Sequence, residues 1–316
     1  VAGNFSEQDV TLNINDLAED EPEPDTEPEA GPDPEPIDST TGDNQDVIVA
    51  IQGFPAIGYN LTATLSSSDS EEGLISPSQY RWELSSDGTN WRRAGARETF
   101  KVKQKHGDQS LRLQLNYPDA EGSQQTVFST ISEVSSGLLL PLPDSKTNKK
   151  LSSTFKIGNV KIRSLKTGND KKDKLIDSNQ SDLIAGHLKK DILTGRKKAD
   201  VFVLSTFNLG KANSDVIKDF NPKQGDLIAF DLEDFPRGSK TKFKSVSKSR
   251  QLNKWAAKRH QLIYDKDKGN LYFNANRNLA GFGADGGLIA SLNGNPKLNK
   301  SNIEYLELLA PSDFIV

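Results

Sequence analysis

The 316-residue chain is long enough for two or three hydrophobic cores. Its mean hydropathy of -0.62, with no apolar run of about 18 residues, excludes a membrane-spanning helix and favours a soluble protein. Cysteine is absent, which excludes disulfides and thiolate metal sites, and the net charge of -4 hides an acidic beginning (13 acids and no base in residues 1–38) and a basic end (32 bases and 18 acids, hence +14, in residues 145–316).

The first 45 residues are predicted to hold little folded structure. Residue 1 is valine and no signal-peptide pattern follows it, so we expect a fragment or processed tail of a longer protein. Residues 1–16 include one alternating stretch, Val10 to Asp16, that resembles the closing strand of a cadherin-like repeat; a stray strand is the alternative. Residues 17–45 are predicted to be an acidic, proline-rich linker, because Asp16 to Asp38 holds 11 acids, 6 prolines and no base.

Residues 46–136 are predicted to form a β-sandwich, because apolar residues alternate in short stretches between turn residues. The alternating positions are Leu61, Ala63 and Leu65, then Tyr80, Trp82 and Leu84, then Leu111, Leu113, Leu115 and Tyr117. The segments 53–63 and 80–91 resemble the cysteine-free immunoglobulin-like repeats of bacterial surface proteins, and this resemblance makes Trp82 a core residue. A sugar-binding platform of Trp82 and Trp91 is the alternative.

Residues 137–153 are predicted to be a second linker, and the segment that follows carries the most informative spacing in the sequence. Aspartates recur at every ninth position, each with an apolar residue two positions later, and glycines share one turn position. The aspartates are Asp173, Asp182, Asp191 and Asp200, the apolar residues are Leu175, Ile184, Leu193 and Phe202, and the glycines are Gly168, Gly186 and Gly195.

This spacing resembles the nonapeptide repeats of RTX proteins, in which glycine-rich turns and short strands alternate to build a parallel β-roll. The resemblance implies that the apolar residue of each strand stacks inside the roll. It also implies that turn carbonyls and aspartates surround Ca²⁺. The expected fold class is therefore all-β: an immunoglobulin-like β-sandwich, then a parallel β-roll with capping antiparallel hairpins over residues 154–316.

The turns depart from the family, because their second and third glycines are replaced. The replacements are Ser178 and Gln180, His187 and Lys189, and Arg196 and Lys198. Cations at these turns could neutralise carboxylates in place of calcium, so we expect most of the sites to be calcium-poor or lost and calcium binding to remain at one or two. The metal-site candidates that the resemblance implies are Asp173, Asp177, Asn179, Asp182, Gly186, Asp191, Gly195, Asp200 and Asp215. The turn from Asp177 to Asp182 is the strongest candidate because it keeps oxygen side chains and no cation; a pairing of Asp200 with Asp215 ranks next.

The segments after the repeats resemble serralysin-type C-terminal domains. The matching segments are 214–228, 262–273 and 289–294. The resemblance implies hairpins that cap the roll, with Tyr264, Leu271 and Phe273 in the core. The chain ends with Asp313, Phe314, Ile315 and Val316, which is similar to the uncleaved type I secretion signal of serralysin-like proteases and lipases.

These features predict a non-catalytic C-terminal region of a secreted, adhesin-like bacterial surface protein. The three histidines, His106, His187 and His260, are far apart in the sequence and lie outside HExxH, GxSxG and phosphate-loop patterns. We expect a monomer that is exported by type I secretion machinery and folds outside the cell with calcium. The alternatives are a module that binds acidic polysaccharide or cell-surface glycan, and the tail of a secreted hydrolase whose catalytic domain lies upstream. Specific nucleic-acid binding is not expected.

Overall fold

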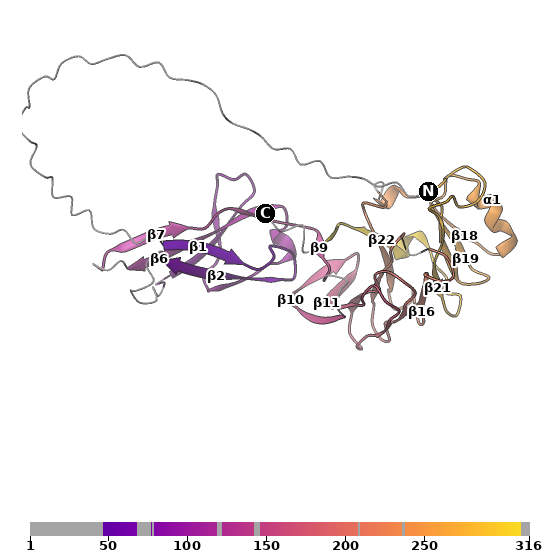
Figure 1. Ribbon diagram of the computed structural model, residues 1–316, viewed down its shortest axis with the longest axis horizontal. Helices are drawn as coiled ribbons and strands as arrows, with labels where there is room; N and C mark the ends of the chain where they lie inside the picture. Colours follow the sequence, from indigo (N-terminus) through magenta and orange to yellow (C-terminus); the bar gives the residue numbers. More distant parts are fainter. Residues whose placement is uncertain are drawn as a thin grey trace, which may run out of the picture. The chain divides into compact units, whose positions relative to one another are not determined.

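The computed structural model describes residues 47–67, 77, 79–118, 122–141, 146–207, 209–235 and 238–310. Strands make up most of the regular structure in these ranges and the helices are short, which confirms the all-β class (Figure 1). The described residues all belong to one compact unit. The expected strand at 10–16, the acidic linker at 17–45 and the terminal residues Asp313 to Val316 lie outside the described residues.

The first part of the described chain folds into two antiparallel sheets. The first sheet contains β1 (Val47–Gln52), β2 (Asn60–Ser67) and β5 (Thr99–Lys101). The second contains β4 (Arg92–Gly95), β3 (Gln79–Ser85), β6 (Gln109–Pro118) and β7 (Gln124–Phe128), and β8 (Ser132–Val134) also pairs with β6. The short 3-10 helix η1 (Gln104–His106) lies between β5 and β6. The alternating residues of β2, β3 and β6 form one core, as their period of two predicts.

Trp82 is the central side chain of this core. It is fully buried, stacks on Phe100 with ring centroids 5.2 Å apart, and its indole N–H donates a hydrogen bond of 2.7 Å to the carbonyl of Arg97. Trp91 is half-buried, and the guanidinium of Arg112 lies over its ring at 4.2 Å. Trp82 is therefore a structural residue, and one face of Trp91 is covered by a cation.

The segment 137–153, expected to be a linker, contains strand residues in the structure. β9 (Leu138–Leu139) pairs in parallel with β23 (Leu308–Leu309), and β10 (Thr147–Ile157) pairs antiparallel with β11 (Val160–Thr167). Burial of Leu138, Leu151 and Phe155 in one apolar cluster accounts for this ordering.

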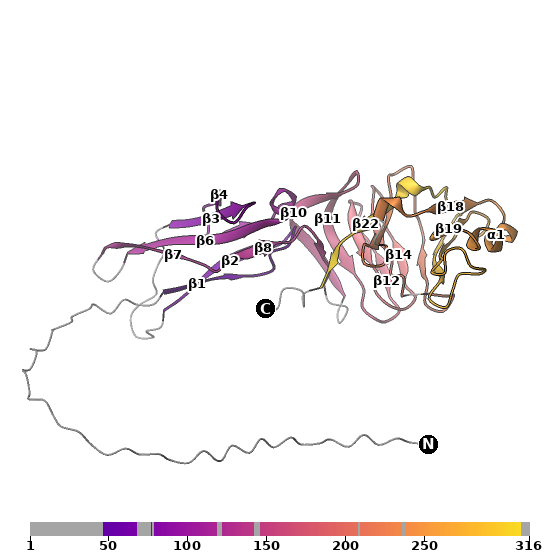
Figure 2. The ribbon, with the colours of Figure 1, turned by 90° about the horizontal axis from the view of Figure 1, so that it is seen from above.

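From β11 to β17, the chain passes alternately between two sheets. One sheet has the order β10, β11, β13 (Asp182–Ala185), β15 (Val201–Val203), β17 (Leu227–Asp231) and β22 (Ile303–Leu306). The other has the order β12 (Lys174–Ile176), β14 (Ile192–Thr194), β16 (Asp215–Ile217), β21 (Gly287–Leu292), β20 (Asn270–Phe273), β19 (Leu262–Asp265) and β18 (Phe243–Val246). Neighbours from β11 to β17 are parallel, and Figure 2 shows β12 and β14 side by side.

The apolar residues of the nine-residue spacing stack inside this coil. Leu175 pairs in register with Leu193, and Ile184 pairs with Phe202. All four are at most 3% exposed and belong to one core cluster. Because one full coil uses two strands, the residues that stack are eighteen positions apart.

The segments after the coil add a hairpin and several short helices. β19 and β20 pair antiparallel, with Tyr264 and Leu271 fully buried, as expected, and Phe273 partly buried. The hydroxyl of Tyr264 donates a 2.8 Å hydrogen bond to the carbonyl of Pro296. The helices are η2 (Gly238–Lys240), η3 (Ser249–Gln251), α1 (Leu252–Ala256) and η4 (Lys300–Asn302).

Four residues that replace glycine at the turns adopt left-handed backbone conformations. Their φ angles are 66° at His187, 70° at Lys189, 66° at Arg196 and 74° at Lys198. A side chain in this region crowds its own backbone, which costs about 1 kcal/mol per residue. The turns that follow Gly186 and Gly195 therefore have a backbone conformation that favours glycine, whereas Ser178 and Gln180 lack a positive φ.

Replacing Lys198 with glycine should stabilise the protein. Lys198→Gly removes the crowding at φ 74°, so we expect the free energy of unfolding to rise by about 0.5–1 kcal/mol. The neighbouring exposed Lys197 lacks a positive φ, so Lys197→Gly should lower it by a similar amount. Urea denaturation of both variants measures the difference, and equal effects would contradict this account of the turns.

Candidate metal centre

The aspartates of the repeat form two ladders of hydrogen bonds. In the first ladder, the backbone N–H of Asp173 donates to Asp191 at 2.7 Å, and that of Asp191 donates to Asp215 at 2.9 Å. In the second ladder, the N–H of Asp182 donates to Asp200, and that of Asp200 donates to Asp226, both at 3.0 Å. Each aspartate stands at or just before its strand, so parallel pairing brings it beside the aspartate of the next coil.

The pairing of Asp200 with Asp215 that we expected is wrong. Asp215 bonds to Asp191 in the first ladder, whereas the ladder partner of Asp200 is Asp226. The reason is that successive repeats enter opposite sheets, so only alternate aspartates are neighbours. The nine-residue spacing did not predict Asp226 as a ladder residue, because 26 residues separate it from Asp200. The sequence Asp-Leu-Ile, which Asp226 and Asp182 both begin, could have indicated it.

The turn glycines are required by the carboxylates. A Cβ on Gly186 would lie 2.2 Å from Oδ2 of Asp191, and one on Gly195 would lie 2.4 Å from Oδ2 of Asp200. Neither glycine has a positive φ, so the constraint is space and not backbone conformation. Each glycine thus allows the aspartate five residues later to fold its carboxylate back against the turn.

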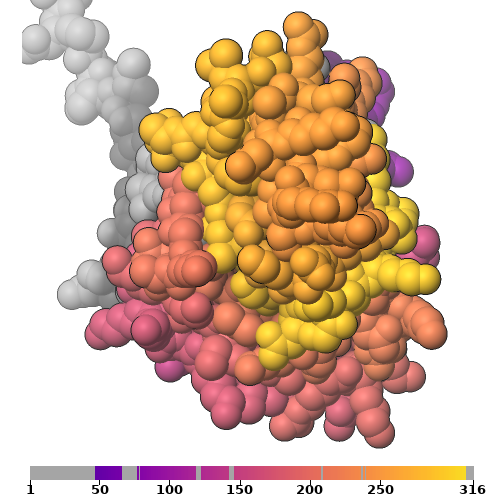
Figure 3. Space-filling view, turned by 90° about the vertical axis from the view of Figure 1, so that its right-hand side faces the viewer, coloured from indigo at the N-terminus to yellow at the C-terminus, as the bar shows by residue number. Residues whose placement is uncertain are grey.

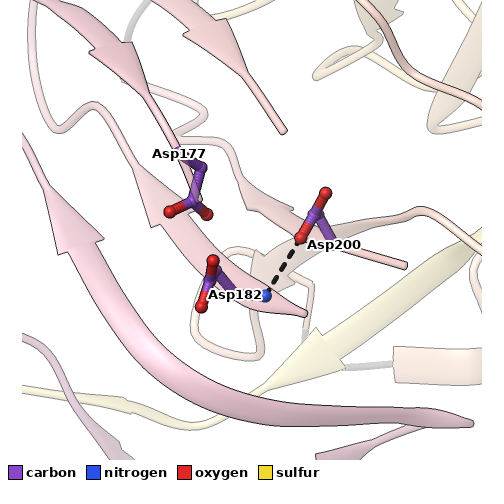
Figure 4. Close-up of side chains that lie close together, drawn as sticks. All are labelled: Asp177, Asp182 and Asp200. Atoms are coloured by element: carbon purple, nitrogen blue, oxygen red, sulfur yellow. Dashed lines mark hydrogen bonds between the residues drawn. The ribbon is translucent and has the colours of Figure 1, made fainter. Parts of the chain in front are cut away.

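Asp177 takes the place of this glycine in the turn that ends at Asp182. Its carboxylate joins those of Asp182 and Asp200, and one oxygen of each lies within 4.8 Å of the others. Figure 4 shows the three side chains gathered between neighbouring coils, with the hydrogen bond from the N–H of Asp182 to Asp200. We call these three residues the carboxylate triad.

Hydrogen bonds satisfy only part of the triad. The hydroxyls of Ser164 and Ser178 donate to the two oxygens of Asp182, and the N–H of Ser178 donates to Oδ1 of Asp177 at 2.7 Å. Oδ2 of Asp177 and Oδ2 of Asp200 are buried without a partner among the described residues. Two unpartnered carboxyl oxygens close to a third carboxylate fit a cation ligand set.

Burial makes Asp177 and Asp200 of the triad reluctant to ionise. Desolvation is the main cause that raises the pKa of Asp177 to about 8, and the neighbouring carboxylate of Asp182 also raises it. Desolvation, with the charges of other ladder carboxylates, raises the pKa of Asp200 to about 9. Desolvation also raises the pKa of Asp191 to about 7, of Asp215 to about 8 and of Asp226 to about 6. A proton or a metal ion therefore relieves these sites.

The lysines that lie near the buried carboxylates are not the ones in the turns, where we expected cations. Lys146 pairs with Asp173 in the first ladder at 2.6 Å. Lys166 donates to the carbonyl of Ile176 at 2.5 Å, and its charge opposes the rise in the pKa of Asp177. The side chains of Arg196 and Lys198 are exposed. In the described part of the chain, no salt bridge joins a Lys or Arg to the carboxylate triad.

The remaining expected site residues have different placements. Asn179 is exposed and stands outside the triad. The three histidines lie on separate segments: His106 in η1, His187 in a coil turn, and His260 after α1. His106 accepts the N–H of Lys103 through Nδ1, and burial lowers its pKa to about 4.

Comparisons of the chain with protein-family models, with curated proteins and with solved structures find no match. Among the described residues, no helix has both the length and the apolar character needed to cross a membrane.

Without metal, stability should fall as the pH rises. The folded-state pKa of Asp200, about 9, lies above the ordinary value of 3.8, so its stabilising contribution is complete below pH 4 and is lost as the pH rises toward 9. Asp200→Asn, measured in a chelator, should match the wild type at pH 4 and exceed its free energy of unfolding at pH 8 by at least about 1 kcal/mol.

The control is Asp285→Asn, which changes an exposed carboxylate. Urea denaturation at several pH values provides the comparison. Parallel pH profiles of Asp200→Asn and the wild type would show that Asp200 ionises freely in the folded state.

Proposed function

We propose that residues 154–310 form an RTX-type β-roll in a secreted, modular bacterial surface protein, and that binding of Ca²⁺ at the carboxylate triad drives its folding outside the cell. The single observation that carries the proposal is the pair of unpartnered, buried oxygens on Asp177 and Asp200. The alternation of β11 to β17 between two sheets, with parallel neighbours in each, and the left-handed turn residues support the assignment to this family.

The chemistry of the triad favours calcium. Its ligands are carboxylate oxygens, which hard divalent cations prefer, and it contains none of the imidazole or thiolate ligands typical of zinc sites. Ca²⁺ accepts irregular sets of six to eight oxygens, whereas Mg²⁺ demands a near-octahedral set. Asp177, Asp182 and Asp200 would hold the ion. Its positive charge would offset the cost of burying their carboxylates.

Coupling of the ion to folding follows from the ladders. The triad joins two turns of neighbouring coils, so its ligands come together only when the coils stack. An unfolded chain lacks this site, and the free energy of binding therefore adds to the free energy of folding. A protein that crosses a membrane unfolded and then meets millimolar calcium gains from such an arrangement, and the lack of cysteine suits passage between redox compartments.

The sandwich fits a spacer or adhesin-type module of the same protein. Its antiparallel sheets and its buried Trp82 agree with an immunoglobulin-like repeat whose core holds without a disulfide. We assign no catalytic role to the described residues.

Calcium should stabilise the wild type and should do so much less for a triad variant. At a calcium concentration of about 100 times Kd, the gain is about 2.7 kcal/mol. Asp177→Asn keeps the shape of the side chain and removes one ligand charge, so we expect at least about a tenfold rise in Kd for Ca²⁺. Calorimetric titration and thermal unfolding with Ca²⁺ or Mg²⁺ measure both effects.

Asp285→Asn serves as the matched control because its carboxylate is exposed, and it should bind Ca²⁺ like the wild type. The proposal fails if wild-type protein gives neither heat nor a thermal shift at millimolar Ca²⁺, or if Asp177→Asn responds as strongly as the control.

Export is the part of the proposal that depends on sequence alone. Asp313, Phe314, Ile315 and Val316 would act as the type I signal, as the resemblance implies. We expect replacement of Phe314, Ile315 and Val316 by serine to keep the chain inside cells that express a type I transporter, while the unaltered chain reaches the medium. Immunoblots of cells and medium measure the ratio; equal secretion of both chains would exclude this role.

A further inference from the structure

A second site lies away from the carboxylate triad, in a pocket lined by cations. Its volume is about 290 Å³, and its lining is Lys240, Lys242, Arg259, Gln261, Arg277 and Asn278. We call it the cationic pocket. Lys240 ends η2, Lys242 precedes β18, Arg259 and Gln261 lead into β19, and the last two follow β20. Four cations and two amides therefore converge from four segments, and the lining contains no acid.

The sequence around the pocket is strongly basic. Residues 235–264 contain nine Lys or Arg and no Asp or Glu. Figure 3 looks onto the face over which this segment, coloured orange, spreads. The charge around the pocket is thus uncompensated along 30 consecutive residues, which raises the local concentration of anions.

Buried hydrogen bonds hold the cationic segments in place. Asn274 is fully buried, and its Nδ2 lies within 2.8–3.3 Å of the carbonyls of Ala256, Lys258, His260 and Arg277. The N–H of Gln261 donates to the carbonyl of Lys242 at 3.0 Å. The backbones that carry Lys242, Arg259 and Arg277 are therefore fixed before a ligand arrives, which lowers the entropic cost of binding.

His260 lies beside the pocket, next in sequence to Arg259 and Gln261. His260 is half-buried, and burial lowers its pKa, with further lowering by the charges of Lys242, Lys244 and Lys258. Neutral His260 thus leaves the lysine and arginine groups as the charge carriers at physiological pH.

We propose that the cationic pocket binds the sulfate or carboxylate groups of an acidic polysaccharide. Arginine forks pair with such oxyanions through two N–H donors, lysine adds point charges, and Gln261 and Asn278 offer hydrogen bonds to sugar hydroxyls. The pocket assigns the alternative function, binding of an acidic polysaccharide, to specific residues. None of these residues belongs to the carboxylate triad.

The surroundings favour a polysaccharide over nucleic acid or a membrane. Single-stranded nucleic acid needs free aromatic faces for its bases, but Lys244 and Lys258 lie over the ring of Trp255 at 4.0 and 5.0 Å, and Tyr272 stacks on Phe282. Leu279, 64% exposed, is one apolar side chain beside the pocket, too little to insert into a bilayer.

The test compares two double variants of the full chain that each remove two positive charges. Lys242→Gln/Arg259→Gln alters the pocket, and Lys161→Gln/Arg163→Gln alters exposed residues of β11. The probe is a heparin-derived sulfated hexasaccharide, with maltohexaose as the uncharged control, in millimolar calcium and about 150 mM salt. Calorimetry gives Kd, and circular dichroism confirms that each variant is folded.

We expect the pocket variant to bind the sulfated hexasaccharide at least about tenfold more weakly than the wild type, and the β11 variant to stay within about twofold. Equal loss in both variants would mean attraction to general charge and would overturn the site. No binding by the wild type, equal binding of maltohexaose, or tighter pocket-dependent binding of a DNA oligonucleotide or of phosphatidylglycerol vesicles would overturn it as well. The triad variant Asp177→Asn, if folded, should keep hexasaccharide binding, so the two proposals can fail separately.

Discussion

The hydrogen bond from the backbone N–H of one ladder aspartate to the carboxylate of the next is the contact on which the coiled half of the chain depends. It satisfies an N–H where a turn enters a strand, and it fixes the register that stacks Leu175 on Leu193 and Ile184 on Phe202. The same bond holds the carboxylate away from water. Stacking of the apolar core and burial of negative charge are therefore produced together, and neither can change alone.

Rows of buried carboxylates destabilise a fold unless positive charge or protons compensate them. The first ladder has Lys146 against Asp173. The second ladder has the triad, where Asp177 adds a third carboxylate at the position of a glycine. Arg196 and Lys198, in the turn before Asp200, are exposed, and among the described residues no salt bridge joins a Lys or Arg to the triad. The departure from the glycine pattern thus concentrates the need for a cation at one place and does not abolish it.

The nine-residue spacing predicted the inward stacking correctly, because that feature depends on residues close in sequence. It did not predict which aspartates are neighbours, because a coil contains two strands and the spatial period is eighteen. Asp226 lies beyond a longer turn, so counting by nine could not reach it. Residues 138–139 form a strand because a distant strand, β23, pairs with them. The cationic pocket was invisible for the same reason, since the β19–β20 hairpin brings Arg277 back to Lys242.

The two charged sites affect each other through the field of the whole segment. Residues 145–316 carry +14 although the ladders contribute acids to that sum. Protonation or metal binding at the buried carboxylates removes negative charge, so the surface that a ligand meets becomes more positive than the formal count. With calcium bound as proposed, the coil would be both more stable and more attractive to anions. Folding outside the cell and attachment to an acidic polymer would then be favoured by the same ion.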